Sequence, residues 1–431
     1  MARILILTPQ LPIPPQALTG MSQGTTIRNF NLIAGLAKRH DIDLLTLLAP
    51  AALSGGSAEA PGRTSSNEPA TPALNLLQPY CGTIIAEPAP VRTLLRRARD
   101  TALNPLPDLA LRLSNPAMHA HMAELLRAKH YDVIQVEGVE MAPYVSDLWV
   151  AGHPENLSRP RLVFDDHNAE YVLQQRAFLT DLRRPRRWVA AAYSMVQWRK
   201  LTGYERRLCR SADRVVAVSD VDADALRKLA PGLEVAVIPN GVDLEFNRPG
   251  AVPPAGGMSA NALVFTGKMD YRPNVDAVVW FTDAVLPAIQ AQIPDAHFYI
   301  VGQQPHERVQ ALAERPAITV TGRVPDVRPY IAGAGVYIVP LRIGGGTRLK
   351  VLEAMAMGQA LVSTHLGCDG FDFEDDRQVC FADDPADFAE SVIGLLRDRA
   401  QAADLGRRAR AYVEAHFSWE AIVPRLEALY R

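Results

Sequence analysis

The chain has 431 residues and a formal net charge of -2, and 48% of its residues are hydrophobic and 21% charged. This length exceeds what one compact core holds and predicts two or three domains, while the balanced charge gives no general electrostatic case for nucleic-acid binding. The four cysteines are far apart and form no Cys-x-x-Cys motif, which argues against a zinc site. No apolar run is long enough to span a bilayer and no signal peptide is evident, so we expect a cytoplasmic protein.

Short apolar strands alternate with amphipathic helices in the first half of the chain. We expect strands at 3–9, 42–48, 83–86, 133–137, 162–166, 214–219 and 235–239, and helices at 26–39, 116–129, 169–211 with a break near Pro185, and 223–229. Residues 51–73 are rich in Gly, Ser, Pro and Ala, and we expect them to form a disordered insert.

The second half repeats this alternation, with expected strands at 263–267, 297–302, 318–322, 336–341 and 360–364 and helices at 275–293, 305–315, 327–334 and 418–430. Prolines and glycines cluster at 246–260 and indicate a linker. Strand–helix alternation is typical of parallel sheets covered on both faces. We therefore predict an α/β fold with two doubly wound parallel-sheet domains facing a cleft, at 1–247 and 248–415, followed by a helix within 416–431.

The most informative motif is GGGTRLKVLEAMAMG at 344–358, a glycine loop that follows an apolar strand and opens a helix. Glycines let backbone amides approach a ligand, and the start of a helix binds anions. Arg348 and Lys350 add positive charge where the helix dipole disfavours it, which suggests an external anion such as a phosphate. Glu353, one turn later, suits hydroxyl groups such as a ribose diol. The run indicates a nucleoside-diphosphate site, and the alternative is an ordinary loop in which Glu353 pairs with Lys350.

Five further motifs occur in order along the chain: GTTIR at 24–28, DDHNAE at 165–170, IPNGVD at 238–243, FTGKMDYRPN at 265–274 and LVST at 361–364. Together with the glycine loop they resemble the GT-B glycosyltransferases of family 4, over nearly the whole chain outside 51–73. The resemblance implies two Rossmann-like domains, with a nucleotide-sugar donor held by the C-terminal one and an acceptor held mainly by the N-terminal one. It also implies retention of the anomeric configuration, and a last helix that crosses back onto the first domain.

The donor site departs from the family pattern at one carboxylate. The family's Glu-x7-Glu pair would place glutamates at 345 and 353, but Gly345 stands at the first position. Glu353 is therefore the implied ribose ligand, whereas the contact with the donor sugar differs from the usual one. The expected donor-binding residues are Gly24, Thr25, Gly267, Arg272, Asn274, Gly345, Gly346, Thr347 and Glu353.

A second departure concerns the positive charge on the leaving group. Many family members carry a lysine where Pro273-Asn274 stands here. We expect Lys268, Arg348 and Lys350 to neutralise the leaving diphosphate together. Gly24 and Thr25 open a helix whose free amides suit the same anion, although Thr25 is as well suited to capping that helix.

The expected chemistry uses no metal, no cofactor and no covalent nucleophile. Metal-using transferases carry an Asp-x-Asp at a strand end, whereas Asp41-x-Asp43 begins a strand here and Asp220-x-Asp222 caps a helix start. His167 follows the strand at 162–166, and the family places a histidine in this region near the primary hydroxyl of the donor sugar. The alternative for His167 is a helix cap or a loop contact.

Two basic runs in the first half, at 92–99 and at 183–188 with Trp188, suit an anionic membrane and a lipid-linked acceptor, and the alternative for each is a solvated helix face. We predict a retaining, metal-independent glycosyltransferase. It would move a hexose from a UDP- or GDP-linked donor to a glycan or lipid-linked acceptor in polysaccharide biosynthesis, such as that of an exopolysaccharide. The alternative, motivated by Gly345, is a protein that binds nucleotide sugars or acts as a scaffold without turnover. A nicotinamide oxidoreductase is disfavoured because no G-x-G-x-x-G follows the first strand.

Overall fold

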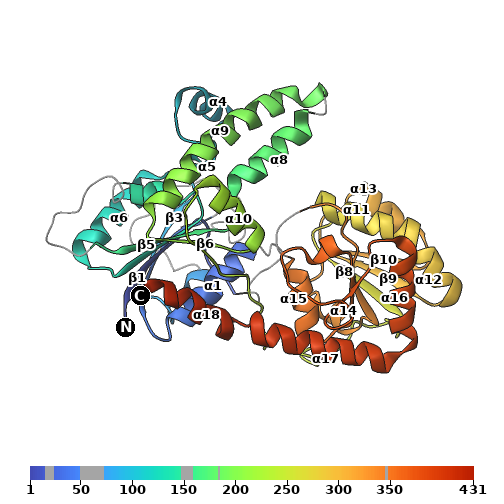
Figure 1. Ribbon diagram of the computed structural model, residues 1–431. Helices are drawn as coiled ribbons and strands as arrows, with labels where there is room; N and C mark the ends of the chain where they lie inside the picture. The colour runs from blue at the N-terminus through green and yellow to red at the C-terminus, as the bar shows by residue number, and fades with distance from the viewer. Residues whose placement is uncertain (15–23, 49–71, 147–158, 183–184, 345–347) are drawn as a thin grey trace. The chain divides into compact units, whose positions relative to one another are not determined.

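The computed structural model describes residues 1–14, 24–48, 72–146, 159–182, 185–344 and 348–431, which form two compact units (Figure 1). Unit 1 contains the described residues up to Pro239 together with Val423–Arg431, and unit 2 contains those from Asn240 to Ile422. The predicted insert at 51–73 lies outside the described residues except for its last two, which begin a short helix.

The described part of unit 1 forms a seven-stranded parallel sheet in the order β3-β2-β1-β4-β5-β6-β7. Its strands are β1 (Arg3–Thr8), β2 (Asp41–Leu48), β3 (Thr83–Pro88), β4 (Val133–Glu137), β5 (Arg161–Asp166), β6 (Arg214–Ala217) and β7 (Val235–Val237). Its helices are α1 (Gly24–Leu36), α3 (Pro72–Asn75), α4 (Leu94–Leu103), α5 (Asp108–Leu111), α6 (Pro116–Ala128), α8 (Glu170–Leu182), α9 (Trp188–Ser211) and α10 (Asp220–Leu229).

The described part of unit 2 forms a six-stranded parallel sheet in the order β10-β9-β8-β11-β12-β13. Its strands are β8 (Ala262–Thr266), β9 (His297–Val301), β10 (Ile318–Gly322), β11 (Val336–Val339), β12 (Leu361–Ser363) and β13 (Cys380–Phe381). Its helices are α11 (Arg272–Trp280), α12 (Leu286–Gln292), α13 (Glu307–Gln310), α14 (Arg328–Ala332), α15 (Leu349–Ala356), α16 (Pro385–Arg397) and α17 (Arg399–His416).

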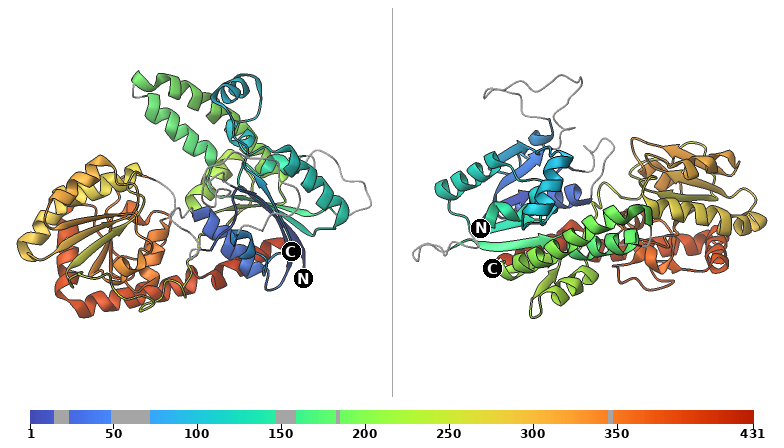
Figure 2. Two further views of the ribbon diagram at one scale, coloured as in Figure 1. Left: turned by 180° about the vertical axis from the view of Figure 1, so that it is seen from behind. Right: turned by 90° about the horizontal axis from the view of Figure 1, so that it is seen from above.

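Both sheets confirm the predicted α/β fold, and every strand expected from the sequence is present. Helices lie on both faces of each sheet (Figure 1, Figure 2), which is why strands such as β1 and β8 read as continuous apolar runs. In each sheet the strand order reverses beside the first strand of the unit, since β1 lies between β2 and β4 and β8 lies between β9 and β11. Ligands of doubly wound folds bind at the carboxyl ends of the strands at such a reversal.

The last helix, α18 (Trp419–Glu427), is shared between the two units, because its residues from Val423 onward belong to unit 1. The Ser418 hydroxyl caps it by accepting a hydrogen bond from the Ala421 amide at 3.2 Å. Val423 packs so closely on α1 that a Cβ at Gly35 would lie 2.5 Å from a Val423 methyl group. No helix of the described residues is both long and apolar enough to cross a bilayer.

Candidate functional site

In unit 1, polar side chains meet where β4 and β5 end next to each other. Glu137 is the last residue of β4 and pairs in register with Asp165 of β5. His167 follows β5, and its Nε2 lies 3.1 Å from Glu137 Oε2. Arg28 of α1 reaches the same point, where its Nη2 donates to Asp165 Oδ2 at 2.8 Å. Because Arg28, Glu137 and Asp165 are each 1% exposed or less, this cluster is a buried charge network.

The protonation states of this cluster follow from its burial. Burial and the nearby Asp165 carboxylate raise the pKa of Glu137 well above its usual value. Burial lowers the pKa of His167, so that the imidazole is neutral near pH 7. Gln135 donates to Glu137 and Tyr430 donates to Gln135, which fixes the carboxyl group against His167.

Sequence reasoning identified His167 but missed Glu137, its neighbour in space. The available signal was the strand sequence Val-Ile-Gln-Val-Glu, in which two polar residues share one face although every position is buried. The alternative role for His167, capping the next helix, is taken by Glu205. Its carboxylate accepts hydrogen bonds from the Glu170 and Tyr171 amides at the start of α8, at 2.9 Å each.

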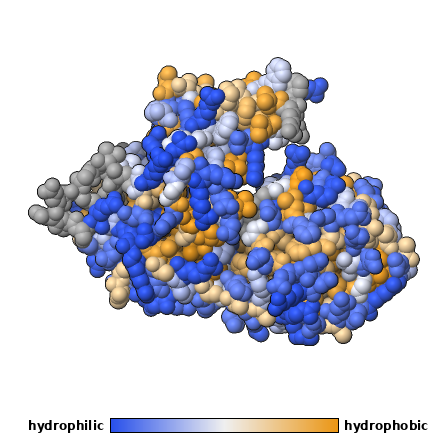
Figure 3. Space-filling model, in the orientation of Figure 1, coloured by the Kyte–Doolittle hydropathy of each residue, from blue (hydrophilic) through white to orange (hydrophobic). Residues whose placement is uncertain are grey.

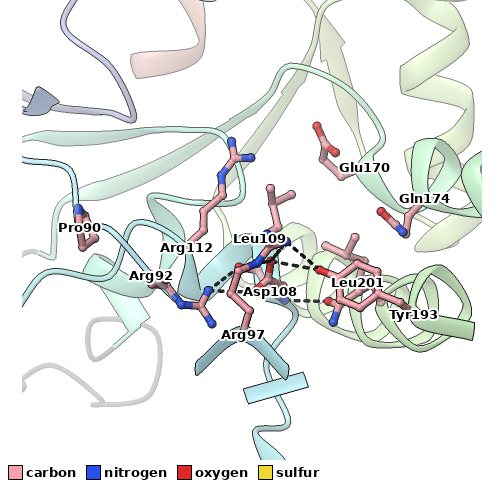
Figure 4. Close-up of a pocket in the computed structure, with 11 residues that line it drawn as sticks. Pro90, Arg92, Arg97, Asp108, Leu109, Arg112, Glu170, Gln174, Tyr193 and Leu201 are labelled. Carbon is pink, nitrogen blue, oxygen red and sulfur yellow. Dashed lines mark hydrogen bonds and ion pairs between the residues drawn. The ribbon is translucent and has the colours of Figure 1, made fainter. Parts of the chain in front are cut away.

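A cavity of about 490 Å³ opens beside the start of α8 (Figure 4). Burial, together with the Glu140 and Glu205 carboxylates, raises the pKa of Glu170 in its wall to about 7. Arg112 pairs with Glu140, which lies three residues after the end of β4. The cavity is lined by Pro90, Arg92, Arg97, Asp108, Leu109, Arg112, Glu170, Gln174, Tyr193, Gln197 and Leu201.

In unit 2, the strand-end glycine, helix α11 and the start of α15 bring three expected donor-site residues together. Lys350 Nζ donates to Asn274 Oδ1 at 3.1 Å, and Asn274 Nδ2 donates to the backbone oxygen of Lys268 at 2.9 Å. A Cβ at Gly267 would lie 2.7 Å from both Lys350 Nζ and Asn274 Nδ2. A side chain at position 267 would therefore have to displace the Lys350 amine and the Asn274 amide from this arrangement.

Cations concentrate at the amino end of α15, as the motif predicted. Arg348 is the N-cap residue and is buried, which lowers its pKa. Burial, reinforced by Arg348, lowers the pKa of Lys350 to about 7, against the opposing effect of Glu353. Lys350 Nζ also lies 3.9 Å from the centre of the Phe265 ring. Burial raises the pKa of Glu353, and Lys350 counteracts this shift.

The remaining expected residues divide between the two units. Lys268 is half exposed, and its Nζ lies 3.3 Å from Asp270 Oδ2. Arg272 is exposed at the start of α11. Gly24 and Thr25 are partly buried in the first turn of α1 in unit 1. Gly345, Gly346 and Thr347 lie outside the described residues.

Comparison with known proteins places these features in a family. Residues 22–246 match the family model described as Glycosyltransferase Family 4, and residues 260–398 match that described as Glycosyl transferases group 1. A sucrose-phosphate synthase from Thermosynechococcus elongatus has a similar fold, with a TM-score of 0.65 and 18% identity over 100% of this chain and 98% of that one.

Two curated relatives are mannosyltransferases by name. The phosphatidyl-myo-inositol mannosyltransferase of Mycolicibacterium smegmatis is 28% identical over 226 residues, which are 50% of this chain and 56% of the relative. The match thus spans about half the length of that relative. The GDP-mannose-dependent alpha-(1-6)-phosphatidylinositol monomannoside mannosyltransferase of Mycobacterium tuberculosis is 24% identical over 333 residues, which are 70% of this chain and 85% of the relative.

Proposed function

Because the chain belongs to glycosyltransferase family 4, we propose that it transfers a hexose from a nucleoside-diphosphate sugar to a glycan or lipid-linked acceptor. The transfer would retain the anomeric configuration, need no metal ion and extend a polysaccharide or its precursor. The observation that carries the proposal is the pair of cations at the start of α15, where Arg348 and Lys350 are held close together by the fold.

Burial and mutual repulsion disfavour the charges of this pair in the donor-free protein, although Tyr271 and Asp369 partly stabilise Arg348. The amino end of a helix already carries a partial positive charge, so that a cation there is destabilised. The lowered pKa of Lys350 also indicates that its charged form is destabilised, because burial and Arg348 both disfavour that form. A diphosphate would remove this cost, since it brings negative charge to the cations and to the free amides of the helix.

The same contacts would stabilise the departing nucleoside diphosphate, on which negative charge develops during transfer. Glu353 lies one turn further along α15 and would accept hydrogen bonds from ribose hydroxyls. The proposal assigns His167 to the transferred sugar through Nδ1, because Nε2 faces Glu137. The names of the relatives favour GDP-mannose as the first donor to test, with UDP-linked hexoses as the next.

Metal independence is supported by charge balance in unit 1. Among the described residues, Glu137, Asp165 and His167 form the group whose ligand atoms lie close enough together to hold a metal, within 4.8 Å. Arg28 already supplies a cation to Asp165, and the raised pKa of Glu137 favours a proton on its carboxyl group. A metal ion would have to displace both. A transfer rate that falls in EDTA and returns with Mg²⁺ or Mn²⁺ would contradict this part of the proposal.

The cavity of unit 1 is the proposed acceptor site. Its lining combines arginines, amides and a tyrosine with the carboxyl groups of Asp108 and Glu170 and with two leucines, which suits a hydroxyl-rich head group bearing apolar substituents. Figure 4 shows Arg92 and Arg97 converging on Asp108, whereas Glu170 and Gln174 come from α8.

The test combines binding and turnover. Thermal shifts with UDP, GDP, ADP and dTDP identify the base, and release of the nucleoside diphosphate from GDP-mannose or UDP-glucose measures turnover. We expect Lys350→Met and Arg348→Met to weaken donor binding by about tenfold or more each, because each removes a charged hydrogen-bond donor. Arg397→Met, at an exposed position at the end of α16, is the matched control.

Each outcome bears on a separate part of the proposal. Unchanged donor binding and turnover in both site variants would contradict the assignment of the cations. Tight nucleotide binding without turnover on any donor or acceptor would favour the donor-binding alternative. Inversion of the product anomer, read by NMR, would contradict retention.

A further inference from the structure

Helix α4 presents its apolar side to solvent and its polar side to the protein. Four apolar side chains on α4 or just before it are between 79% and 85% exposed: Val91, Leu94, Leu95 and Leu103. No residue of this helix is buried. A helix that stabilised the fold would be oriented the other way, with its leucines packed on the core.

Polar contacts hold the inward side of α4. Arg92 bonds to Asp100 at 2.7 Å and to Asp108 at 2.8 Å, and Arg97 bonds to Asp108 at 3.0 Å. Thr101 accepts a hydrogen bond from Gln197 of α9 at 3.2 Å. This network fixes the orientation of the helix, so that the exposed leucines cannot rotate inward without breaking several ion pairs.

Arg96 and Arg99 are exposed beside the leucines. Asp100 is the one acidic residue of α4, and its carboxylate pairs with Arg92 at 2.7 Å and with Arg99 at 3.4 Å. An apolar stripe bordered by arginines is the composition of helices that lie in the interface of an anionic membrane. The tip of the neighbouring α8–α9 hairpin has the same composition, with exposed Leu182, Trp188, Val189, Arg186 and Arg187.

Both elements belong to one lobe of unit 1. Figure 1 shows α4 beside α9, where the α8–α9 hairpin stands away from the sheet, and Figure 3 shows apolar and strongly polar surface side by side on this lobe. The basic runs at 92–99 and 183–188, which the sequence alone left open as solvated helix faces, thus belong to elements that also expose apolar side chains.

We propose that the outward side of α4 docks on an anionic lipid bilayer, with its leucines among the acyl chains and Arg96 and Arg99 at the head groups. This inference does not depend on the proposed reaction, because it follows from the orientation of one helix. It is consistent with the reaction, since the cavity proposed for the acceptor is lined by Arg92 and Arg97 on the inward side of the same segment. A lipid-linked acceptor would therefore lie near the docking surface.

The test uses the full chain and needs no nucleotide. The protein is sedimented with vesicles of phosphatidylcholine alone and with vesicles that also contain phosphatidylglycerol, at low and at high salt. We expect binding to the anionic vesicles only, and weaker binding at high salt. The double variant Leu94→Ser/Leu95→Ser should bind about tenfold less, and Arg96→Glu/Arg99→Glu should abolish binding. Val221→Ser, at an exposed apolar position on α10, should bind like the wild type.

A fluorescent label reports the contact directly. The four native cysteines are buried, so Leu95→Cys introduces one reactive thiol on the outward side of α4. An environment-sensitive dye at that thiol should shift to the blue on addition of anionic vesicles and be quenched by brominated lipid, whereas a dye on Val221→Cys should do neither. The proposal would be overturned if the wild-type protein did not sediment with anionic vesicles. The proposal would also be overturned if the protein sedimented with the vesicles while the dye at position 95 kept the emission it has in water. It would be overturned, too, if that emission shifted with protein concentration in the absence of lipid, because this would show that a second copy of the chain covers α4.

Discussion

Donor binding should be coupled to a proton on Lys350. Burial and Arg348 lower the pKa of the Lys350 amine to about 7 in the donor-free protein. At pH 8 about nine-tenths of these amines are then neutral, against about one-tenth at pH 6. A bound diphosphate favours the charged amine and raises its pKa again. Binding at pH 8 should therefore take up about 0.9 proton, and affinity should fall roughly tenfold per pH unit above 7.

The stability of the empty protein should respond to pH in the opposite direction. In the unfolded chain the Lys350 amine regains the ordinary lysine pKa of 10.5. Between pH 7 and that value the unfolded chain binds more protons than the folded one, so that this residue makes the folded state more stable as pH rises. Over the same pH range, a rise in pH should therefore weaken donor binding and make the donor-free protein more stable. A general loss of structure at high pH would instead lower both the affinity for the donor and the stability.

Isothermal titration calorimetry with a nucleotide sugar, in buffers of different ionisation enthalpy at pH 6, 7 and 8, measures the proton uptake. A nucleotide sugar is used because the terminal phosphate of a free nucleoside diphosphate itself titrates near pH 6. Lys350→Arg is the matched control, since a guanidinium stays charged throughout this range and should take up no proton. Proton uptake near zero at pH 8 in the wild type, or equal uptake in Lys350→Arg, would refute the reasoning.

Three further substitutions test other parts of the molecule. Arg28→Met leaves the buried Asp165 carboxylate without this ion pair and should lower the free energy of unfolding by about 3–5 kcal/mol in chemical denaturation; a loss below about 1 kcal/mol would mean that the pair contributes little. Glu353→Gln should weaken nucleoside-diphosphate binding by about 1.5–3 kcal/mol but leave pyrophosphate binding unchanged, and an equal loss for both ligands would argue against a ribose contact. Gly267→Ala places a methyl group 2.7 Å from Lys350 Nζ, so it should weaken donor binding in calorimetry, and unchanged affinity would show that Lys350 can move away without cost.

The sequence predicted the strands because their signal is local. A strand covered on both faces reads as an apolar run, and the order of such runs indicates a parallel sheet. The amino end of α15 was predictable for the same reason, since the glycine loop, the cations and the helix are contiguous.

The network around His167 depends on which strands are neighbours in the sheet, and the hydrophobic pattern of the sequence does not show this. Glu137 is thirty residues before His167, and the two meet because β4 and β5 are adjacent in the sheet. Arg28 reaches Asp165 from a helix near the amino terminus. Strand neighbours are set by tertiary packing, so the partner of a strand-end residue is visible only once the strand order is known.

The orientation of α4 shows a second limit of sequence patterns. An amphipathic pattern reveals that a helix has two unlike sides but not which side the protein covers. Here the polar side is covered, because Asp108 and Gln197 supply partners for its charges and hydroxyl groups. Those partners lie on elements that are distant in sequence from one another.

The sharing of α18 between units has a consequence for how the protein is made. Tyr430 donates to Gln135 beneath the His167 network, and Glu427 pairs with Arg39 after α1. Both residues come after unit 2 in the chain although they belong to unit 1, so unit 1 cannot complete its structure until unit 2 has been synthesised. A gene fragment cut after Pro239 would encode unit 1 without that segment, and an isolated first unit should need residues 423–431 supplied as a fused or added peptide.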